Sequence, residues 1–351
     1  MVRREAIQGC LLGTAVGDAL GLPYEGLSPR RAARLWGPPS RYRLLAGWGM
    51  VSDDAEHTVM VVESLIESAG DVAAFECALA KRLRRWFWAL PAGVGMATAK
   101  ACAKLTVGVS PKRSGVYSAG NGPAMRTAML GVFSQSDPQL ASLVHANTTI
   151  THTDPRAEMG ALAIAVAAQC AAAGVSAPDD YLGRLKRHVI VNDSEEFVTR
   201  MERAVAHAKQ RGATAELADE FGLGRGVGGY VLDCVPVVVH CWLTNQDDFR
   251  AAMETVIACG GDADTNAAML GGILGAGLGP DAIPREWRDR LLLFPMSLRQ
   301  FDRLGNQLVD TIDSGKPRKT TSPWWIAHLV RNLAFLLVVL LHGLRRVAPP
   351  Y

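Results

Sequence analysis

Cys259-Gly260-Gly261-Asp262-Ala263-Asp264-Thr265-Asn266-Ala267 is the stretch around which the chain is organised. Two glycines precede two carboxylates and a hydroxyl, and the small residues of 267–279 predict a tightly packed helix after them. Residues two apart do not share a helix face, so Asp262 and Asp264 converge only if they lie in a turn that leads into this helix. Two interpretations fit: a capped helix start, or a site for a hard cation, which prefers oxygen ligands.

A second acidic cluster, Ser52-Asp53-Asp54, stands far upstream. Ser52 is a good N-cap for a helix that runs to about residue 68, and acids in a first turn match the helix dipole. Two such clusters in one chain are harder to explain as caps. Together they offer four carboxylates and two hydroxyls, which is the ligand chemistry of a two-cation site. The six residues are Ser52, Asp53, Asp54, Asp262, Asp264 and Thr265.

Composition sets the broad class. The 351 residues, 49% hydrophobic and 20% charged, suffice for one large domain or two ordinary ones with a buried core. The net charge is +3, so we expect no nucleic-acid partner, and the basic, aromatic face of a helix predicted over 73–90 is interpreted as a solvated or partner surface. Seven scattered cysteines without a Cys-x-x-Cys pair, and no signal peptide pattern, predict a cytoplasmic protein.

The remaining pattern predicts helices. Small residues at close spacing predict a closely packed helix over 6–20, and Asp154-Pro155 predicts the start of a core helix over 157–173. Residues 231–243 could pass for a strand because of their valines, but we favour a buried helix. Residues 28–50, rich in proline and glycine, are predicted to be a loop.

The C-terminal residues 317–351 differ in kind from the rest. A polar linker leads to a hydrophobic helix over 324–347, whose continuous apolar core, residues 333–341, is shorter than the roughly 20 residues of a spanning helix. A helix docked on the domain and a helix lying in a membrane interface both fit. We slightly favour the peripheral membrane contact.

The order of five motifs resembles the ADP-ribosylglycohydrolase family, which includes dinitrogenase reductase-activating glycohydrolase. The motifs are Gly13-Thr14-Ala15-Val16-Gly17-Asp18-Ala19-Leu20-Gly21 with Glu25, Ser52-Asp53-Asp54, Gly120-Asn121-Gly122-Pro123-Ala124-Met125-Arg126, Thr151-His152-Thr153-Asp154-Pro155 and Gly261-Asp262-Ala263-Asp264-Thr265. The resemblance spans about residues 6–300.

This resemblance implies a compact all-α catalytic domain over 1–316 with a central two-metal cleft that holds two Mg²⁺ or Mn²⁺. It implies an enzyme that hydrolyses the glycosidic bond of an ADP-ribosyl group on a protein or small molecule, and we expect a monomer. The implied catalytic residues are Glu25, Asp54 and Asp262. The implied metal ligands are Ser52, Asp53, Asp54, Asp262, Asp264 and Thr265. The implied ADP-ribose pocket consists of Gly120, Asn121, Gly122, Met125, Arg126 and His152.

Two departures from the family pattern concern substrate and activity. Ala55 stands where a threonine is common, and Val116-Tyr117-Ser118 lacks the acid that arginine-directed relatives carry there, which argues against ADP-ribosyl-arginine as the substrate. Two alternatives therefore stay open: a non-catalytic ADP-ribose-binding protein on the same fold, and a hydrolase of a related nucleotide or glycoside.

Overall fold

The computed structural model describes residues 4–188, 195–321 and 325–347. The predicted all-α fold is confirmed. The α-helices are α1 (Arg4–Gly21), α2 (Pro29–Trp36), α3 (Asp53–Ser68), α4 (Val72–Phe87), α5 (Met96–Thr106), α6 (Pro111–Ser114), α7 (Ala128–Phe133), α8 (Asp137–Thr149), α9 (Pro155–Ala172), α10 (Pro178–His188), α11 (Glu195–Lys209), α12 (Thr214–Glu220), α13 (Val231–Thr244), α14 (Phe249–Ala258), α15 (Ala263–Leu278), α16 (Arg285–Arg288), α17 (Leu298–Ser314) and α18 (Trp325–Val347).

Short elements complete the described chain. The 3₁₀ turns are η1 (Leu22–Tyr24), η2 (Ala124–Arg126) and η3 (Pro280–Ala282). Strand β1 (Gly49–Met50) pairs in parallel with β2 (Leu291–Leu292), with Gly49 opposite Leu291. This pair ties the segment before α3 to the segment before α17.

Helices α1 and α15 form the centre of the molecule, and their backbones touch. A Cβ atom on Gly13 would lie 2.1 Å from the carbonyl oxygen of Gly271, and one on Gly17 would lie 2.1 Å from that of Ala267. Gly9 and Gly21 meet Gly275 and Ala263 in the same way, so the contact repeats every four residues along both helices. The small residues of 6–20 and 267–279 are thus explained by one antiparallel seam.

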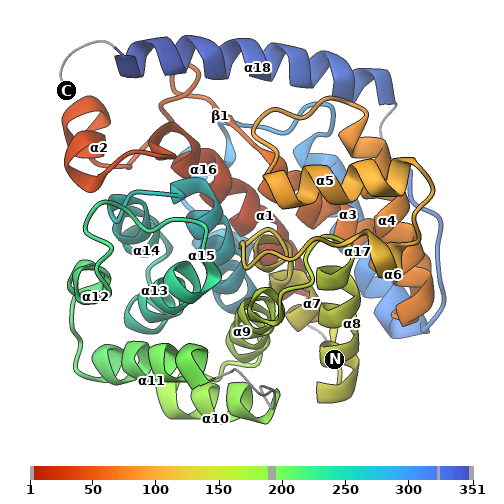
Figure 1. Ribbon diagram of the computed structural model, residues 1–351, viewed down its shortest axis with the longest axis horizontal. Coiled ribbons are helices and arrows are strands. Elements are labelled where there is room, and N and C mark those ends of the chain that lie inside the picture. The colour runs from red at the N-terminus through yellow and green to blue at the C-terminus, as the bar shows by residue number, and fades with distance from the viewer. Residues whose placement is uncertain (1–3, 189–194, 322–324, 348–351) are drawn as a thin grey trace.

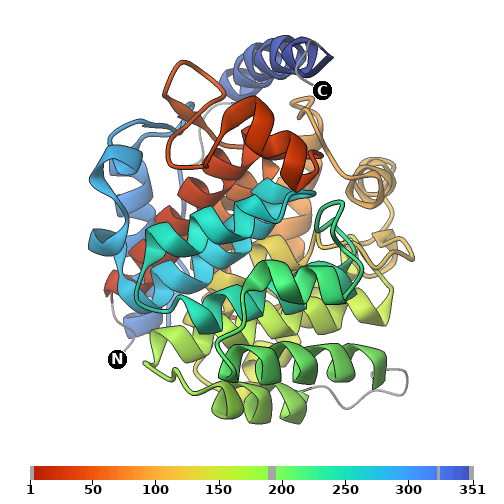
Figure 2. The same cartoon turned by 90° about the vertical axis from the view of Figure 1, so that its left-hand side faces the viewer.

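The other helices surround this seam. Helices α3, α7 and α17 pack on α1, whereas α9, α13 and α14 pack on α15. Figures 1 and 2 place α18 and α2 at one end of the molecule and α10 and α11 at the opposite end.

Most predicted elements are confirmed, but two predictions differ from the structure. Helix α15 begins at Ala263 rather than at the predicted 267, so Asp264 lies in the first turn of the helix and not in a turn before it. Residues 231–243 fall in helix α13, and Asp154 caps α9, as expected. The predicted loop over 28–50 is wrong in part, because Pro29–Trp36 forms α2, with Pro29 in its first turn. Trp324 and residues 348–351, which belong to the predicted C-terminal segment, lie outside the described residues.

The seam predicts opposite effects for the same substitution at two helical glycines. Gly13→Ala should lower the free energy of unfolding by roughly 1–3 kcal/mol, because the added methyl group forces α1 and α15 apart. Gly183→Ala in α10 should stabilise the protein by roughly 0.5–1 kcal/mol, since nothing lies within 4 Å of the new Cβ. Urea unfolding measures both, and equal effects would contradict the seam.

Candidate functional site

The turn before α15 is held by backbone hydrogen bonds to two other loops. Gly260 and Gly261 adopt φ values of 66° and 79°, in the left-handed region that favours glycine. The Gly261 amide donates to the Leu27 carbonyl (2.8 Å), and the Asp262 amide donates to the Val227 carbonyl (2.8 Å). The two glycines therefore bring Asp262 beside the loop after η1 and the loop before α13.

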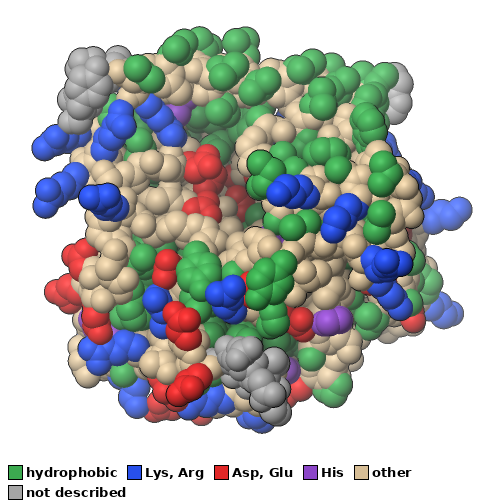
Figure 3. Space-filling model, viewed as in Figure 1, with side chains coloured by type: hydrophobic (Ala, Val, Ile, Leu, Met, Phe, Trp, Pro, Cys, Tyr) green, Lys and Arg blue, Asp and Glu red, His purple; other side chains and the backbone are tan. Residues whose placement is uncertain are grey.

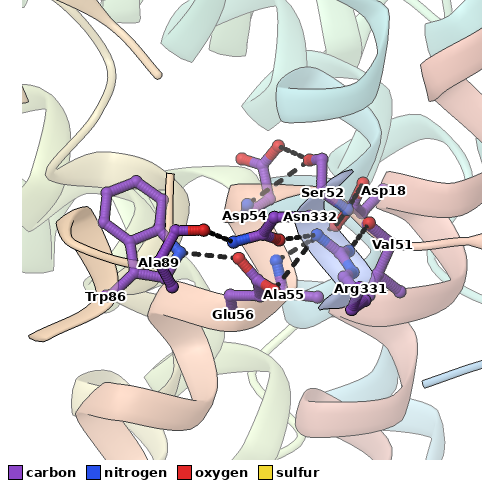
Figure 4. Close-up of polar contacts among 10 residues, drawn as sticks. All are labelled: Asp18, Val51, Ser52, Asp54, Ala55, Glu56, Trp86, Ala89, Arg331 and Asn332. Atoms are coloured by element: carbon purple, nitrogen blue, oxygen red, sulfur yellow. Dashed lines mark hydrogen bonds and ion pairs between the residues drawn. The ribbon is translucent and has the colours of Figure 1, made fainter. Parts of the chain in front are cut away.

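The two acidic clusters meet in space, as the sequence predicted for a shared site. The Thr265 hydroxyl at the start of α15 donates to Asp54 Oδ2 at the start of α3 (3.3 Å). The Ser52 hydroxyl donates to the same oxygen (3.2 Å; Figure 4). Figure 3 shows acidic side chains gathered in a hollow of the surface, directly below α18.

Helix capping explains one cluster but not the other. Ser52 caps α3, because its side chain accepts from the Asp54 amide. Asp262 occupies the N-cap position of α15 without a side-chain capping bond. One of its oxygens instead accepts from Asn121 Nδ2 (2.7 Å).

Burial and mutual repulsion act on the clustered carboxylates. Burial first, and then the charges of Asp18, Asp53 and Asp262, raise the pKa of Asp54 well above its usual range. Burial and neighbouring acids, led by Glu25, do the same to the pKa of Asp264. Burial, again the main cause, raises the pKa of Asp53 to about 8. Such a cluster stays ionised at neutral pH only when cations compensate the charge.

The donor chemistry fits hard cations. Carboxylate and hydroxyl oxygens are the ligands that Mg²⁺ takes, and the buried Asp54 Oδ1 has no hydrogen-bond partner. Among the residues that the structure describes, however, no group of three or more His, Cys, Asp or Glu side chains is already arranged to hold a metal. The candidate ligands therefore lie near one another but are not arranged in coordination geometry.

Asp18 is a residue of the site that the sequence analysis did not assign. It lies on α1 and is fully buried, and its carboxylate accepts from the amides of Ser52 (2.8 Å) and Ala55 (3.1 Å) (Figure 4). Burial raises its pKa to about 7 despite these bonds. Asp18 thus positions the start of α3, and a lone acid among the small residues of α1 was the feature that could have revealed it.

Most residues of the predicted ADP-ribose pocket come together beside the acids. A Cβ on Gly122 would lie 3.0 Å from the His152 ring, so the Gly120-Asn121-Gly122 turn lies directly against this ring. The Asn121 amide donates to the Gly229 carbonyl (2.9 Å), which adds the glycine-rich loop before α13 to the site. Burial, aided by the Arg126 charge, lowers the pKa of His152 to about 3, so the ring is neutral at physiological pH.

Arg126 and Met125 are buried rather than displayed. The Arg126 side chain is 0% exposed, and it donates to Asn147 Oδ1 (2.7 Å) and to the Thr151 hydroxyl (2.9 Å). It also contacts His57 Nδ1 at 3.0 Å. In this structure the Arg126 guanidinium is occupied inside the protein, where it holds the segment that carries His152 in place. Neither Asn147 nor His57 belonged to a recognisable motif.

Glu25 lies at the rim, where the C-terminal helix reaches the site. Its side chain is accessible, yet the surrounding protein and then the Asp262 charge raise its pKa. Arg346 of α18 donates to the Glu25 carbonyl (2.6 Å), and Arg331 donates to the Val51 carbonyl, next to Ser52 (Figure 4). The sequence did not reveal these contacts, because they join segments about 300 residues apart.

A partly open cavity of about 470 Å³ lies beside α3. It is lined by α3, α4, the segment before α17 and the start of α18, and by none of the predicted site residues. Its walls include Val59, Met60, Phe294 and Trp325. This cavity is therefore distinct from the acidic hollow.

Comparison with known proteins identifies relatives of the whole fold. An uncharacterized protein of Archaeoglobus fulgidus is 34% identical over 297 residues, which cover 82% of this chain and 92% of that protein. The ADP-ribosyl-[dinitrogen reductase] glycohydrolase of Rhodospirillum rubrum is 26% identical over 81% of this chain and 89% of its own length. A solved ADP-ribosylglycohydrolase-related protein complex superposes with a TM-score of 0.66 and 25% identity, covering 89% of this chain and 99% of that one.

The family model for ADP-ribosylglycohydrolase matches residues 1–317, which leaves α18 outside the match. This match supports hydrolysis of ADP-ribosyl linkages as the general activity. By this match, the chain belongs to the ADP-ribosylglycohydrolase family.

Proposed function

We propose that this protein is a metal-dependent hydrolase that cleaves the glycosidic bond between an ADP-ribosyl group and its protein or small-molecule acceptor. The observation that carries the proposal is the junction of α3 and α15, where the hydroxyls of Ser52 and Thr265 both donate to one carboxylate oxygen of Asp54. Such an arrangement has no evident structural use, since capping leaves Asp262 and one oxygen of Asp54 unexplained.

Two Mg²⁺ or Mn²⁺ ions would be held by Ser52, Asp53, Asp54, Asp262, Asp264 and Thr265. When bound, such ions orient ribose hydroxyls and a water molecule and stabilise developing charge. The side-chain amide of Asn121 fixes the orientation of Asp262 by donating to its carboxylate. Asp18 holds the amides of the first turn of α3 and so fixes the direction from which Asp54 enters the site.

Glu25 is suited to move a proton at the rim of the site. Its carboxyl is accessible and its pKa is raised, and a carboxyl serves best as a general acid or base when its pKa approaches the working pH. Asp54 and Asp262 complete the proposed catalytic set. The Gly120–Gly122 turn, which packs on the buried and neutral ring of His152, offers a surface without charge for the nucleoside part of the substrate.

An acceptor other than arginine fits the surroundings best. The segment before Gly120 carries no acid, and the acid that follows His152, Asp154, is bonded to the guanidinium of Arg156 (2.6 Å). A guanidinium acceptor would therefore find little negative charge on this side of the pocket.

Several expectations remain predictions: the cytoplasmic location, the monomeric state, the absence of a nucleic-acid partner and the division between a catalytic domain over 1–316 and a C-terminal segment over 317–351. Two alternative functions, a non-catalytic ADP-ribose-binding protein and a hydrolase of a related nucleotide or glycoside, are outcomes of the first experiment below.

The first test offers the protein, with Mg²⁺ or Mn²⁺ present, five substrates in which ADP-ribose is linked through arginine, serine, a carboxylate, thymidine or a terminal phosphate. We expect free ADP-ribose to be released from one of them. Asp262→Ala/Asp264→Ala should lower the rate about 100-fold or more, because it removes oxygens that hold both proposed ions. Asp281→Ala/Asp289→Ala is the matched control, since both acids lie on the surface in exposed ion pairs.

The other possible results of this assay separate the alternative functions. Binding of ADP-ribose without release from any linkage would favour a non-catalytic ADP-ribose-binding protein. Release that survives both a chelator and the Asp262→Ala/Asp264→Ala change would contradict a metal-dependent site. Cleavage of a different nucleotide or glycoside alone would favour the third function.

Metal should also stabilise the fold measurably. At about 100 times the dissociation constant, Mn²⁺ should add roughly 2.7 kcal/mol to the free energy of unfolding and raise the melting temperature. Asp264→Asn should abolish this rise. In chelator, the melting temperature of the Asp264→Asn variant should equal or exceed that of the unsubstituted protein, because the variant has one carboxylate fewer in a repulsive cluster. Differential scanning fluorimetry measures both, and a Mn²⁺-induced rise that persists in Asp264→Asn would exclude Asp264 as a ligand.

A further inference from the structure

Helix α18 is amphipathic in the opposite sense to an ordinary surface helix. The side chains that it buries against the domain are Arg331, Asn332, Phe335 and His342. The side chains that it exposes are large and apolar, with exposed fractions from 41% at Ile326 to 70% at Val347. The exposed set is Ile326, Val330, Leu333, Leu336, Leu337, Leu340, Leu341, Leu344 and Val347.

This orientation is fixed by specific polar contacts along the buried face. Near its start, Arg331 pairs with Glu56 (3.2 Å) and Asn332 donates to the Ala89 carbonyl (2.8 Å), as Figure 4 shows. Near its end, His342 donates to the Pro23 carbonyl (3.0 Å) and stacks on Trp36 at 4.6 Å between ring centroids. The polar side chains are therefore committed to the domain, and the apolar face is left outward.

The apolar face lies at an end of the molecule. Figures 1 and 2 show α18 as the outermost element there, with α2 and the segment between α2 and β1 beside it. That segment adds two exposed apolar side chains, Leu45 (37%) and Trp48 (44%). Figure 3 shows hydrophobic side chains along the whole length of α18.

The two segments that form this end of the molecule are basic in sequence, although Arg331 is paired with Glu56 and Arg318 with Asp310. Residues 314–351 contain six basic side chains and no Asp or Glu: Lys316, Arg318, Lys319, Arg331, Arg345 and Arg346. Residues 26–52 contain five arginines and no acid. An apolar helical face flanked by cations and interfacial tryptophans complements a membrane surface that carries anionic lipids.

We propose that α18 lies flat in the interface of an anionic lipid bilayer, with its leucine face in the lipid and its polar face on the rim of the catalytic site. A spanning orientation does not fit, although α18 is long and apolar enough to cross a membrane. Spanning would break the contacts of Arg331, Asn332 and His342 and move these groups into hydrocarbon, where they are strongly disfavoured.

The test is sedimentation of the full-length protein with vesicles of phosphatidylcholine and phosphatidylserine, and of phosphatidylcholine alone. We expect binding to the anionic vesicles, weakened by high salt, and at least tenfold weaker binding for Leu337→Gln/Leu341→Gln. Both leucines are exposed (59% and 58%), and the change adds no charge. Met96→Gln/Val107→Gln removes two apolar side chains that are still more exposed (70% and 80%), at the first residue of α5 and just after its end, and this variant should bind as the unsubstituted protein does.

Four outcomes would overturn the proposal. The first is that the protein binds neither kind of vesicle, and the second is that the Leu337→Gln/Leu341→Gln variant binds as well as the unsubstituted protein. The third is that the bound protein resists extraction by alkaline carbonate, which would indicate a spanning helix. The fourth is a dimer in light scattering that this variant dissociates, without vesicle binding, since a second copy would then cover the face. Vesicle binding requires neither substrate nor metal, so its failure is separable from failure of the proposed hydrolase activity.

Discussion

The backbone contact between α1 and α15 is the constraint on which the rest of the structure depends. Gly13 and Gly17 allow the two helices to approach until carbonyl oxygens nearly touch the opposing glycines. This approach fixes the start of α15 against the end of α1, and therefore places Asp262 and Asp264 near Glu25. Because Asp18 on α1 also anchors the first turn of α3, one helix pair sets the positions of both acidic clusters.

The same arrangement places an unfavourable charge at the centre of the molecule. Burial and mutual repulsion raise the pKa values of Asp53, Asp54 and Asp264, so ionising these carboxylates lowers the stability of the fold in this region. The proposed cations would relieve this repulsion, because each carboxylate would then face a positive charge. The buried Arg126 lies close by, but it is occupied by Asn147 and Thr151.

The C-terminal helix connects the surface of the molecule to this centre. Arg331 and Arg346 of α18 bond to the carbonyls of Val51 and Glu25, which lie next to Ser52 and at the rim of the acidic hollow. The family match ends at residue 317, so α18 is an addition that reaches residues inside the matched domain. The acidic hollow opens beside α18 (Figure 3), so a bilayer on the outer face of α18 would lie close to this hollow.

The sequence alone determined the helical class, the starts of α3 and α9, and the two acidic clusters, because spacing, caps and glycine pairs act over a few residues. The start of α15 at Ala263, before the predicted 267, was decided by the tertiary structure. Only the tertiary structure decided that Asp18 belongs to the site, that Arg126 turns into the core, and that α18 packs its polar side inward. Such features depend on partners about 20 to 300 residues away, and a side chain's direction is set by those partners rather than by its neighbours in the sequence.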